Sequence, residues 1–132
     1  MLSSTIQIRV YYEDTDFSGL VYHANYLRFF ERGRTEGMRE NGYSNSDLMQ
    51  RDDPVVFAVR SMDIQFHKAA RMDDLLDVTT TVAEVKGARM IFDQRIERDG
   101  ELITSAKVMV ACLHPDGRPQ RFPADVREVF SG

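Results

Sequence analysis

Residues 11–26 concentrate groups that could act on a carbonyl compound. They include three carboxylates, Glu13, Asp14 and Asp16, followed by His23 at the start of a helical pattern. A helix start offers unpaired backbone N–H groups and a partial positive charge, which would stabilise a carbonyl oxygen as it gains charge. Asp16 lies seven residues before His23, where a carboxylate could attack the carbonyl or take a proton from water. The spacing therefore favours carbonyl chemistry at a helix N-terminus.

Other interpretations of this segment stay open. Acidic residues before a helix commonly act only as caps and as partners of the helix dipole. A solitary histidine near a helix start is commonly a surface residue or a hydrogen-bonded one. An Asp-x-Asp pair with one histidine suggests a metal site, but it supplies few ligands, and we expect no bound metal.

The elements that position these groups follow from the hydrophobic periodicity. Alternation and β-branched residues predict a strand over residues 5–12, followed by a polar loop over 13–19. The period then changes, and it predicts a helix from about His23 to Asn41-Gly42. Two glycines, Gly33 and Gly37, lie on its apolar face. Because glycine lacks a Cβ atom, a sheet is expected to approach the helix backbone closely there.

The rest of the chain is predicted to form strands and a short terminal helix. The strands are expected over 56–66, 75–85, 89–98 and 102–113, with turns at Lys86-Gly87-Ala88 and Asp99-Gly100, and the helix over 124–130. In the first of them, Val56, Ala58, Met62, Ile64 and Phe66 are expected on one face, interrupted by Arg60. The order of elements predicts an α+β fold with one long helix against a curved antiparallel sheet.

Composition excludes several classes of protein. The 132 residues fit one domain, 1–132, with its own core. The formal net charge of −4 argues against nucleic acid as a partner. The single cysteine, Cys112, excludes an internal disulfide and is expected in the core. No secretory signal and no apolar run near the ~20 residues of a membrane span is visible, so we expect a cytoplasmic protein without an integral membrane segment.

The sequence resembles the hotdog-fold acyl-CoA thioesterases. The resemblance rests on Tyr12-Glu13-Asp14-Thr15-Asp16, Gly19, Val21-Tyr22-His23, Asn25-Tyr26 and Phe30-Glu31-Arg32-Gly33-Arg34. It continues through Phe57-Ala58-Val59-Arg60, Asp73-Asp74-x-Leu76 and Gln94-Arg95-Ile96, and so covers nearly the whole chain. The sequence is most similar to the Tol–Pal-associated, YbgC-type branch, which is related to 4-hydroxybenzoyl-CoA thioesterase. One departure is Gly33, where relatives usually have alanine.

The resemblance implies a hydrolase that cleaves acyl-CoA to a free acid and coenzyme A without a cofactor. It assigns the catalytic carboxylate to Asp16, as nucleophile or as general base. It assigns the backbone N–H of His23 to the thioester oxygen, and it links the His23 side chain to activity, through the placing of water. Tyr12 and Tyr22 are expected to contact the substrate. Asp14 and Glu13 are expected to be structural.

The resemblance also implies an active site between subunits of a homodimer or homotetramer. Candidates for binding coenzyme A from a neighbouring chain are His67, Lys68, Arg71 and Arg89. Most basic residues of the chain are arginines, which suit phosphate groups. The alternatives are a hotdog hydratase acting on acyl thioesters and a non-catalytic module that binds acyl-CoA or docks on a complex.

Overall fold

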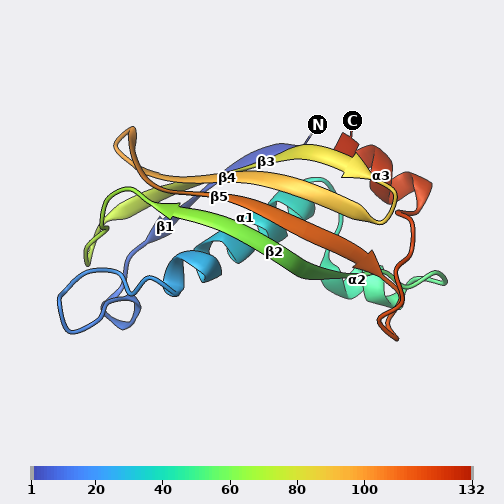
Figure 1. Cartoon of the computed structure of the whole chain (residues 1–132), viewed down its shortest axis with the longest axis horizontal. Helices are drawn as coiled ribbons and strands as arrows, with labels where there is room; N and C mark the ends of the chain where they lie inside the picture. The colour runs from blue at the N-terminus through green and yellow to red at the C-terminus, as the bar shows by residue number, and fades with distance from the viewer. Residues whose placement is uncertain (1, 132) are drawn as a thin grey trace.

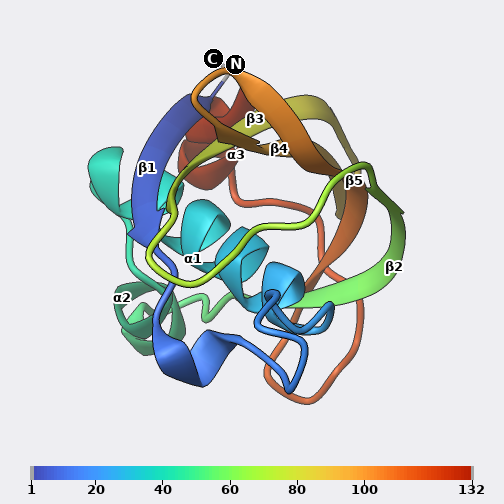
Figure 2. The same cartoon turned by 90° about the vertical axis from the view of Figure 1, so that its left-hand side faces the viewer.

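An antiparallel sheet of five strands curves around one long helix, α1 (Asn25–Glu40) (Figure 1). The computed structural model describes residues 2–131. The strands are β1 (Ser3–Arg9), β2 (Val56–Phe66), β3 (Leu75–Lys86), β4 (Arg89–Arg98) and β5 (Glu101–Leu113). Their order across the sheet is β1-β3-β4-β5-β2, so β1 and β2 form its edges. Figure 2 shows the sheet wrapped around the helix, which confirms the predicted α+β hotdog architecture.

Two glycines bring α1 onto the concave face of the sheet. A Cβ atom at Gly33 would lie 2.7 Å from Thr80 Oγ1 and 3.0 Å from Val78 Cγ1, both on β3. A Cβ atom at Gly37 would lie 3.3 Å from Leu2 Cδ2. The close approach that the glycine spacing predicts is therefore present, and it is tightest at Gly33.

A β-bulge at Arg60 interrupts the regular alternation of β2. Val59 pairs with Val110 of β5, and Ser61 pairs with the adjacent Met109, so Arg60 is an additional residue without a partner in the ladder. An extra residue in one strand reverses which face the following side chains point to.

The expectation that Val56, Ala58, Met62, Ile64 and Phe66 share one face is therefore wrong. Residues paired across an antiparallel ladder lie on the same face, and Phe57 and Met62 pair with the fully buried Cys112 and Val108. The face of β2 that points toward the core is formed by Phe57, Val59, Met62, Ile64 and Phe66. Before the bulge, the alternation of Val56 and Ala58 places them on the opposite face.

The segment between β1 and α1 also differs from the prediction. β1 ends at Arg9, and Tyr12–Asp14 form a 3₁₀ turn, η1, instead of continuing the strand. The Asp14 side chain accounts for this change, because its Oδ2 accepts a hydrogen bond from Tyr11 N at 2.8 Å. Helix α1 begins at Asn25, two residues after the predicted start.

Two short helices complete the fold. α2 (Asn45–Gln50) lies in a stretch for which no element was expected, and Ser44 caps it by accepting a hydrogen bond from Asp47 N at 3.1 Å. α3 (Ala124–Ser131) matches the predicted terminal helix. Cys112 is fully buried, as expected, and burial raises the pKa of its thiol to about 11. Within residues 2–131, no helix has the length and apolar character needed to cross a membrane.

Candidate active site

The loop between β1 and α1 is anchored at both ends to the β2–β3 connection. Val10 N donates to Asp74 O at 2.8 Å, and Val21 N donates to Ala70 O at 2.9 Å. The buried hydroxyl of Tyr26 accepts a hydrogen bond from Ala70 N at 3.0 Å. These bonds hold the acidic residues of the loop close to the start of α1, at the left-hand end of Figure 1.

Asp16 opens a tight turn that presents its carboxylate at the surface. Gly19 N donates to Asp16 O at 3.0 Å, and Asp16 N donates to Leu20 O at 2.9 Å. Gly19 has a φ of +80°, a conformation that glycine adopts readily and other residues rarely do. The Asp16 side chain is exposed.

Ser18 fixes one oxygen of this carboxylate. Asp16 Oδ1 accepts hydrogen bonds from Ser18 Oγ at 2.5 Å and from Ser18 N at 2.9 Å. These bonds favour the charged form and lower the pKa of Asp16 below its usual value, and His23 adds a smaller electrostatic effect in the same direction. Asp16 Oδ2 has no hydrogen-bond partner within residues 2–131. The site therefore holds an ionised carboxylate with one fixed and one free oxygen.

The start of α1 supplies free backbone donors. Ala24 occupies the N-cap position and offers no side-chain acceptor. The first bonds of the helix run from Asn25 N to Tyr22 O and from Tyr26 N to His23 O. In the part of the chain that the structure describes, no acceptor is found for the N–H groups of His23 and Ala24. They can therefore bind an oxygen that carries developing negative charge.

Aromatic rings surround the exposed His23 imidazole. Its ring centroid lies 4.7 Å from that of Tyr22 and 6.2 Å from that of Phe66, the last residue of β2. Tyr12 instead extends into solvent with 82% of its surface exposed. Neither Ser18 nor Phe66 was predicted from the sequence as a residue of the site. In a recognised turn pattern, an Asp side chain accepts a hydrogen bond from the backbone N–H two residues later. This pattern could have indicated Ser18 as the partner of Asp16.

Three of the expected basic residues lie at the same end of the molecule. Lys68 is ion-paired with Glu101 at 2.7 Å, and His67 hydrogen-bonds a serine of β5 at 2.8 Å. Arg71 forms a β-bridge with Leu20, which places it against the loop that holds the carboxylate. Unlike Lys68, the Arg71 guanidinium has no ion pair within residues 2–131.

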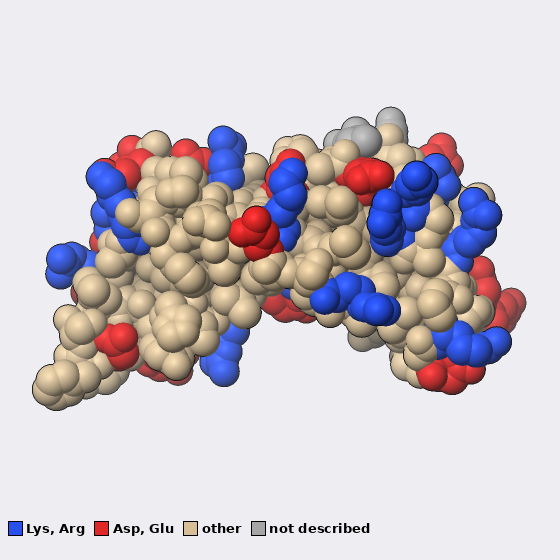
Figure 3. Space-filling view, in the orientation of Figure 1, with Lys and Arg blue, Asp and Glu red and all other residues tan. Residues whose placement is uncertain are grey.

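Arg89 lies at the opposite end of the sheet. β4 separates it from the site by roughly 30 Å, at about 3.4 Å per residue. With Arg60 and Lys86 it lines an open hollow of about 450 Å³, and none of the three has an ion-pair partner among the described residues. Figure 3 shows basic side chains gathered toward this end. Within one subunit, Arg89 and Asp16 are therefore far apart.

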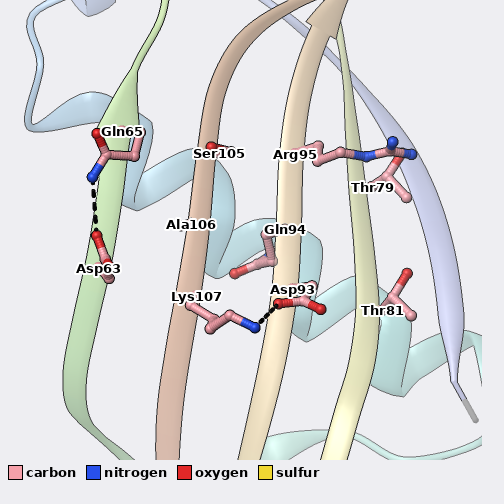
Figure 4. A pocket seen from close by; sticks show the side chains of 10 residues that line it. All are labelled: Asp63, Gln65, Thr79, Thr81, Asp93, Gln94, Arg95, Ser105, Ala106 and Lys107. Atoms are coloured by element: carbon pink, nitrogen blue, oxygen red, sulfur yellow. Dashed lines mark hydrogen bonds and ion pairs between the residues drawn. The ribbon is translucent and has the colours of Figure 1, made fainter.

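A larger hollow lies on the outer face of the sheet and is separate from this site (Figure 4). Its volume is about 540 Å³, and its walls are polar side chains of the strands, with Lys107 ion-paired to Asp93 at 3.3 Å. None of its lining residues belongs to the loop between β1 and α1. Within residues 2–131, no group of three His, Cys, Asp or Glu side chains is arranged to hold a metal ion.

Sequence comparison connects this geometry with known proteins. Residues 10–130 match the model of the Thioesterase-like superfamily. The chain is 44% identical over 124 residues to the acyl-CoA thioesterase YbgC of Haemophilus influenzae, covering 93% of this chain and 90% of the relative. It is 40% identical over 125 residues to the acyl-CoA thioester hydrolase YbgC of Escherichia coli O6:H1, and the match covers 93% of this chain and 92% of the relative.

Solved structures agree with the sequence relatives. A probable thioesterase from Bartonella henselae superposes with a TM-score of 0.89 at 41% identity, covering 92% of this chain and 99% of the other. A 4-hydroxybenzoyl-CoA thioesterase complexed with 4-hydroxybenzoyl-CoA superposes with a TM-score of 0.91 at 22% identity, covering 98% of this chain and 99% of the other. At this identity, the likeness supports the fold. The chain therefore belongs to the Thioesterase-like superfamily and, within it, to the YbgC family that its motif indicates.

Proposed function

We propose that the protein hydrolyses acyl-CoA thioesters to a free acid and coenzyme A. The observation that carries the proposal is the pairing of an ionised Asp16 carboxylate with unpaired N–H groups at His23 and Ala24. A thioester needs both a group that attacks or activates water and donors for the carbonyl oxygen. The YbgC relatives, named as acyl-CoA thioesterases, support this activity.

Two routes are open to Asp16. As a general base, it takes a proton from water while the water oxygen bonds to the carbonyl carbon. As a nucleophile, it bonds to that carbon itself and forms a mixed anhydride that water then hydrolyses. In both routes the carbonyl oxygen is stabilised by the N–H of His23, the carbon–sulfur bond breaks, and the coenzyme A thiolate takes a proton. An acyl adduct on the Asp16 peptide, trapped during a single turnover, would select the second route.

We propose that two subunits complete each active site, in a homodimer or homotetramer. β2 is an edge strand, and edge strands are commonly covered by another copy. If two β2 edges pair antiparallel, the start of one β2 lies beside the end of the other, near the partner's His23. Arg89, with Arg60 and Lys86, would then face that site, and their charges suit the phosphates of coenzyme A.

Five further residues at this end of the molecule are proposed to contact the substrate. Arg71, for which no ion pair is found within residues 2–131, supplies a guanidinium from the same subunit as the carboxylate. Tyr12, Tyr22, His67 and Lys68 line the approach from the two loops at this end. We also propose that the enzyme is located in the cytoplasm, together with its acyl-CoA substrate. Cell fractionation tests this location.

A free-thiol assay with a panel of acyl-CoA substrates tests the activity. Asp16→Asn is expected to lower kcat by about a hundredfold or more, because proton transfer by a positioned group contributes that much. Glu13→Gln, an exposed carboxylate in the same loop, is the matched control and is expected to retain activity. Full activity in Asp16→Asn would overturn the mechanism. A wild type that binds acyl-CoA but releases no thiol would indicate a binding module instead.

A further inference from the structure

A groove runs between α1 and β2, and we call it the α1–β2 groove. α1 packs against β1 and β3, which leaves its opposite side next to the edge strand β2. Two hollows follow each other along this groove, an open outer one of about 460 Å³ and an inner one of about 200 Å³. Both are lined by Glu31, Arg34 and Val59, so the two hollows adjoin at these residues.

The groove begins beside the proposed active site. Leu27, which lines the outer hollow, is one helical turn after His23. Phe66, whose ring lies 6.2 Å from that of His23, begins the opposite wall. The residues of β2 that point to this side are apolar: Phe66, Ile64, Met62, Val59 and Phe57, of which Met62 and Val59 line the outer hollow and Val59 and Phe57 the inner one. An acyl chain that leaves a thioester held at His23 would continue between these walls.

Arg34 is a buried charge in the middle of this groove. The residue is only 8% exposed, and burial lowers the pKa of its guanidinium. Nη1 donates to Gln94 Oε1 at 2.9 Å, and Nη2 donates to Glu31 Oε2 at 2.5 Å. Gln94 is itself fixed, because its Nε2 donates to Phe30 O at 2.9 Å and to Thr80 Oγ1 at 2.8 Å. The guanidinium is therefore held in place by the core.

The hydrogen bonds of Arg34 leave donors unused. A guanidinium carries five N–H donors, and the bonds found within residues 2–131 use two of them. Arg34 lines both hollows, so an oxygen in the groove could accept a charge-assisted hydrogen bond from one of the remaining donors. Glu31 provides an acceptor directly beside these donors and balances the charge of Arg34. A neighbouring donor and acceptor together match a hydroxyl group, whereas a carboxylate would be repelled by Glu31.

We propose that the α1–β2 groove binds the acyl chain and that Arg34 and Glu31 select chains with a hydroxyl group along their length. This inference rests on the proposed thioesterase activity. Glu31 is eight residues beyond His23, roughly 12 Å along the helix axis, so the hydroxyl lies well away from the thioester. The inner hollow, whose apolar side Phe57 and Val110 help to line, receives the end of the chain.

The test compares kcat/KM for dodecanoyl-CoA and for hydroxydodecanoyl-CoA isomers that differ in the carbon bearing the hydroxyl. We expect one position in the distal half of the chain to be favoured about tenfold or more, as one hydrogen bond to a charged group allows. Arg34→Met removes the donors but keeps an apolar side chain of similar length, so it should abolish this preference. Arg39→Met is the control, because Arg39 is an exposed residue of the same helix that pairs with Glu36.

A second variant covers the case in which Arg34→Met fails to fold. Val59 lies on the wall that both hollows share, and Val59→Phe should narrow the groove there. It is expected to slow cleavage of the dodecanoyl substrates and to spare acetyl-CoA. A wild type without hydroxyl preference, or a preference unchanged in Arg34→Met, would overturn the inference. Absence of cleavage for every thioester would instead overturn the proposed function.

Discussion

At the scale of single residues, Ser18 controls the state of the proposed catalytic carboxylate. It donates two hydrogen bonds to Asp16 Oδ1, one from its hydroxyl and one from its backbone. The same bonds that lower the pKa of Asp16 also fix its orientation, so Oδ2 remains free. A carboxylate that is ionised and aimed before the substrate arrives loses little freedom in the reaction.

Replacing Ser18 should therefore change the pH dependence of catalysis. Ser18→Ala removes the hydroxyl, the largest of the causes that lower the pKa of Asp16, and keeps the backbone bond. The pKa of Asp16 should rise. Because the active form is the carboxylate, which exists above its pKa, the acid limb of the kcat/KM profile should move to higher pH. The profile is measured against Ser46→Ala, an exposed serine of α2. An acid limb that does not move would show that ionisation of Asp16 does not limit the rate.

At the scale of elements, the contact between α1 and β3 depends on the absence of one methyl group. Gly33→Ala would place Cβ 2.7 Å from Thr80 Oγ1, whose position is fixed by the hydrogen bond from Gln94. Overpacking of this kind costs about 1–3 kcal/mol and outweighs the gain in helix propensity of up to about 1 kcal/mol. We expect Gly33→Ala to lower the free energy of unfolding, as measured by urea denaturation.

Gly37→Ala is the matched control for this contact. Its nearest neighbour would be Leu2 Cδ2 at 3.3 Å, the end of a flexible side chain that can move aside. The substitution should be neutral or stabilising by up to about 1 kcal/mol, because alanine favours the helix. Equal effects of the two substitutions would contradict the assignment of Gly33 as the closer contact.

The elements themselves were largely predictable from periodicity, and the exceptions have local causes. Apolar residues recur about every 3.6 residues in the long helix and every two residues in the strands, and a single sequence displays both repeats directly. The bulge at Arg60 was not predicted, because the apolar residues on both sides of it fit either face. The early end of β1 depends on one hydrogen bond, which Tyr11 N donates to Asp14 Oδ2 and which no periodic pattern reports.

The site was predictable to the extent that it is contiguous in the sequence. Asp16 and His23 lie in one motif, whereas Arg34 meets Gln94 only in the folded chain. Arg34 pairs with Glu31 at the i, i+3 spacing of a helix, but a charged residue on a helix gives no sign in the sequence that it will be buried. The neighbouring Arg32 lies over the ring of Phe29, with its guanidinium carbon 5.8 Å from the ring centroid.

At the scale of the whole molecule, the distance between Arg89 and Asp16 makes the proposed assembly testable. One subunit alone keeps them roughly 30 Å apart, because β4 extends between the two ends of the sheet. If Arg89 binds coenzyme A at the site of a neighbouring subunit, each site combines Asp16 from one chain with Arg89 from the other. Subunits with different defects should then restore each other.

Coexpression of Asp16→Asn and Arg89→Glu subunits tests this arrangement. In a mixed dimer, one site has both defects and the other has neither, so random assembly should restore about a quarter of wild-type activity. Asp16→Asn mixed with His23→Ala is the control, because both residues belong to the same loop and no mixed dimer contains an intact site. Recovery only in the first mixture would establish that Arg89 serves the partner's site. If neither mixture recovers activity, each subunit binds its substrate alone. Light scattering would then show whether the subunits associate at all.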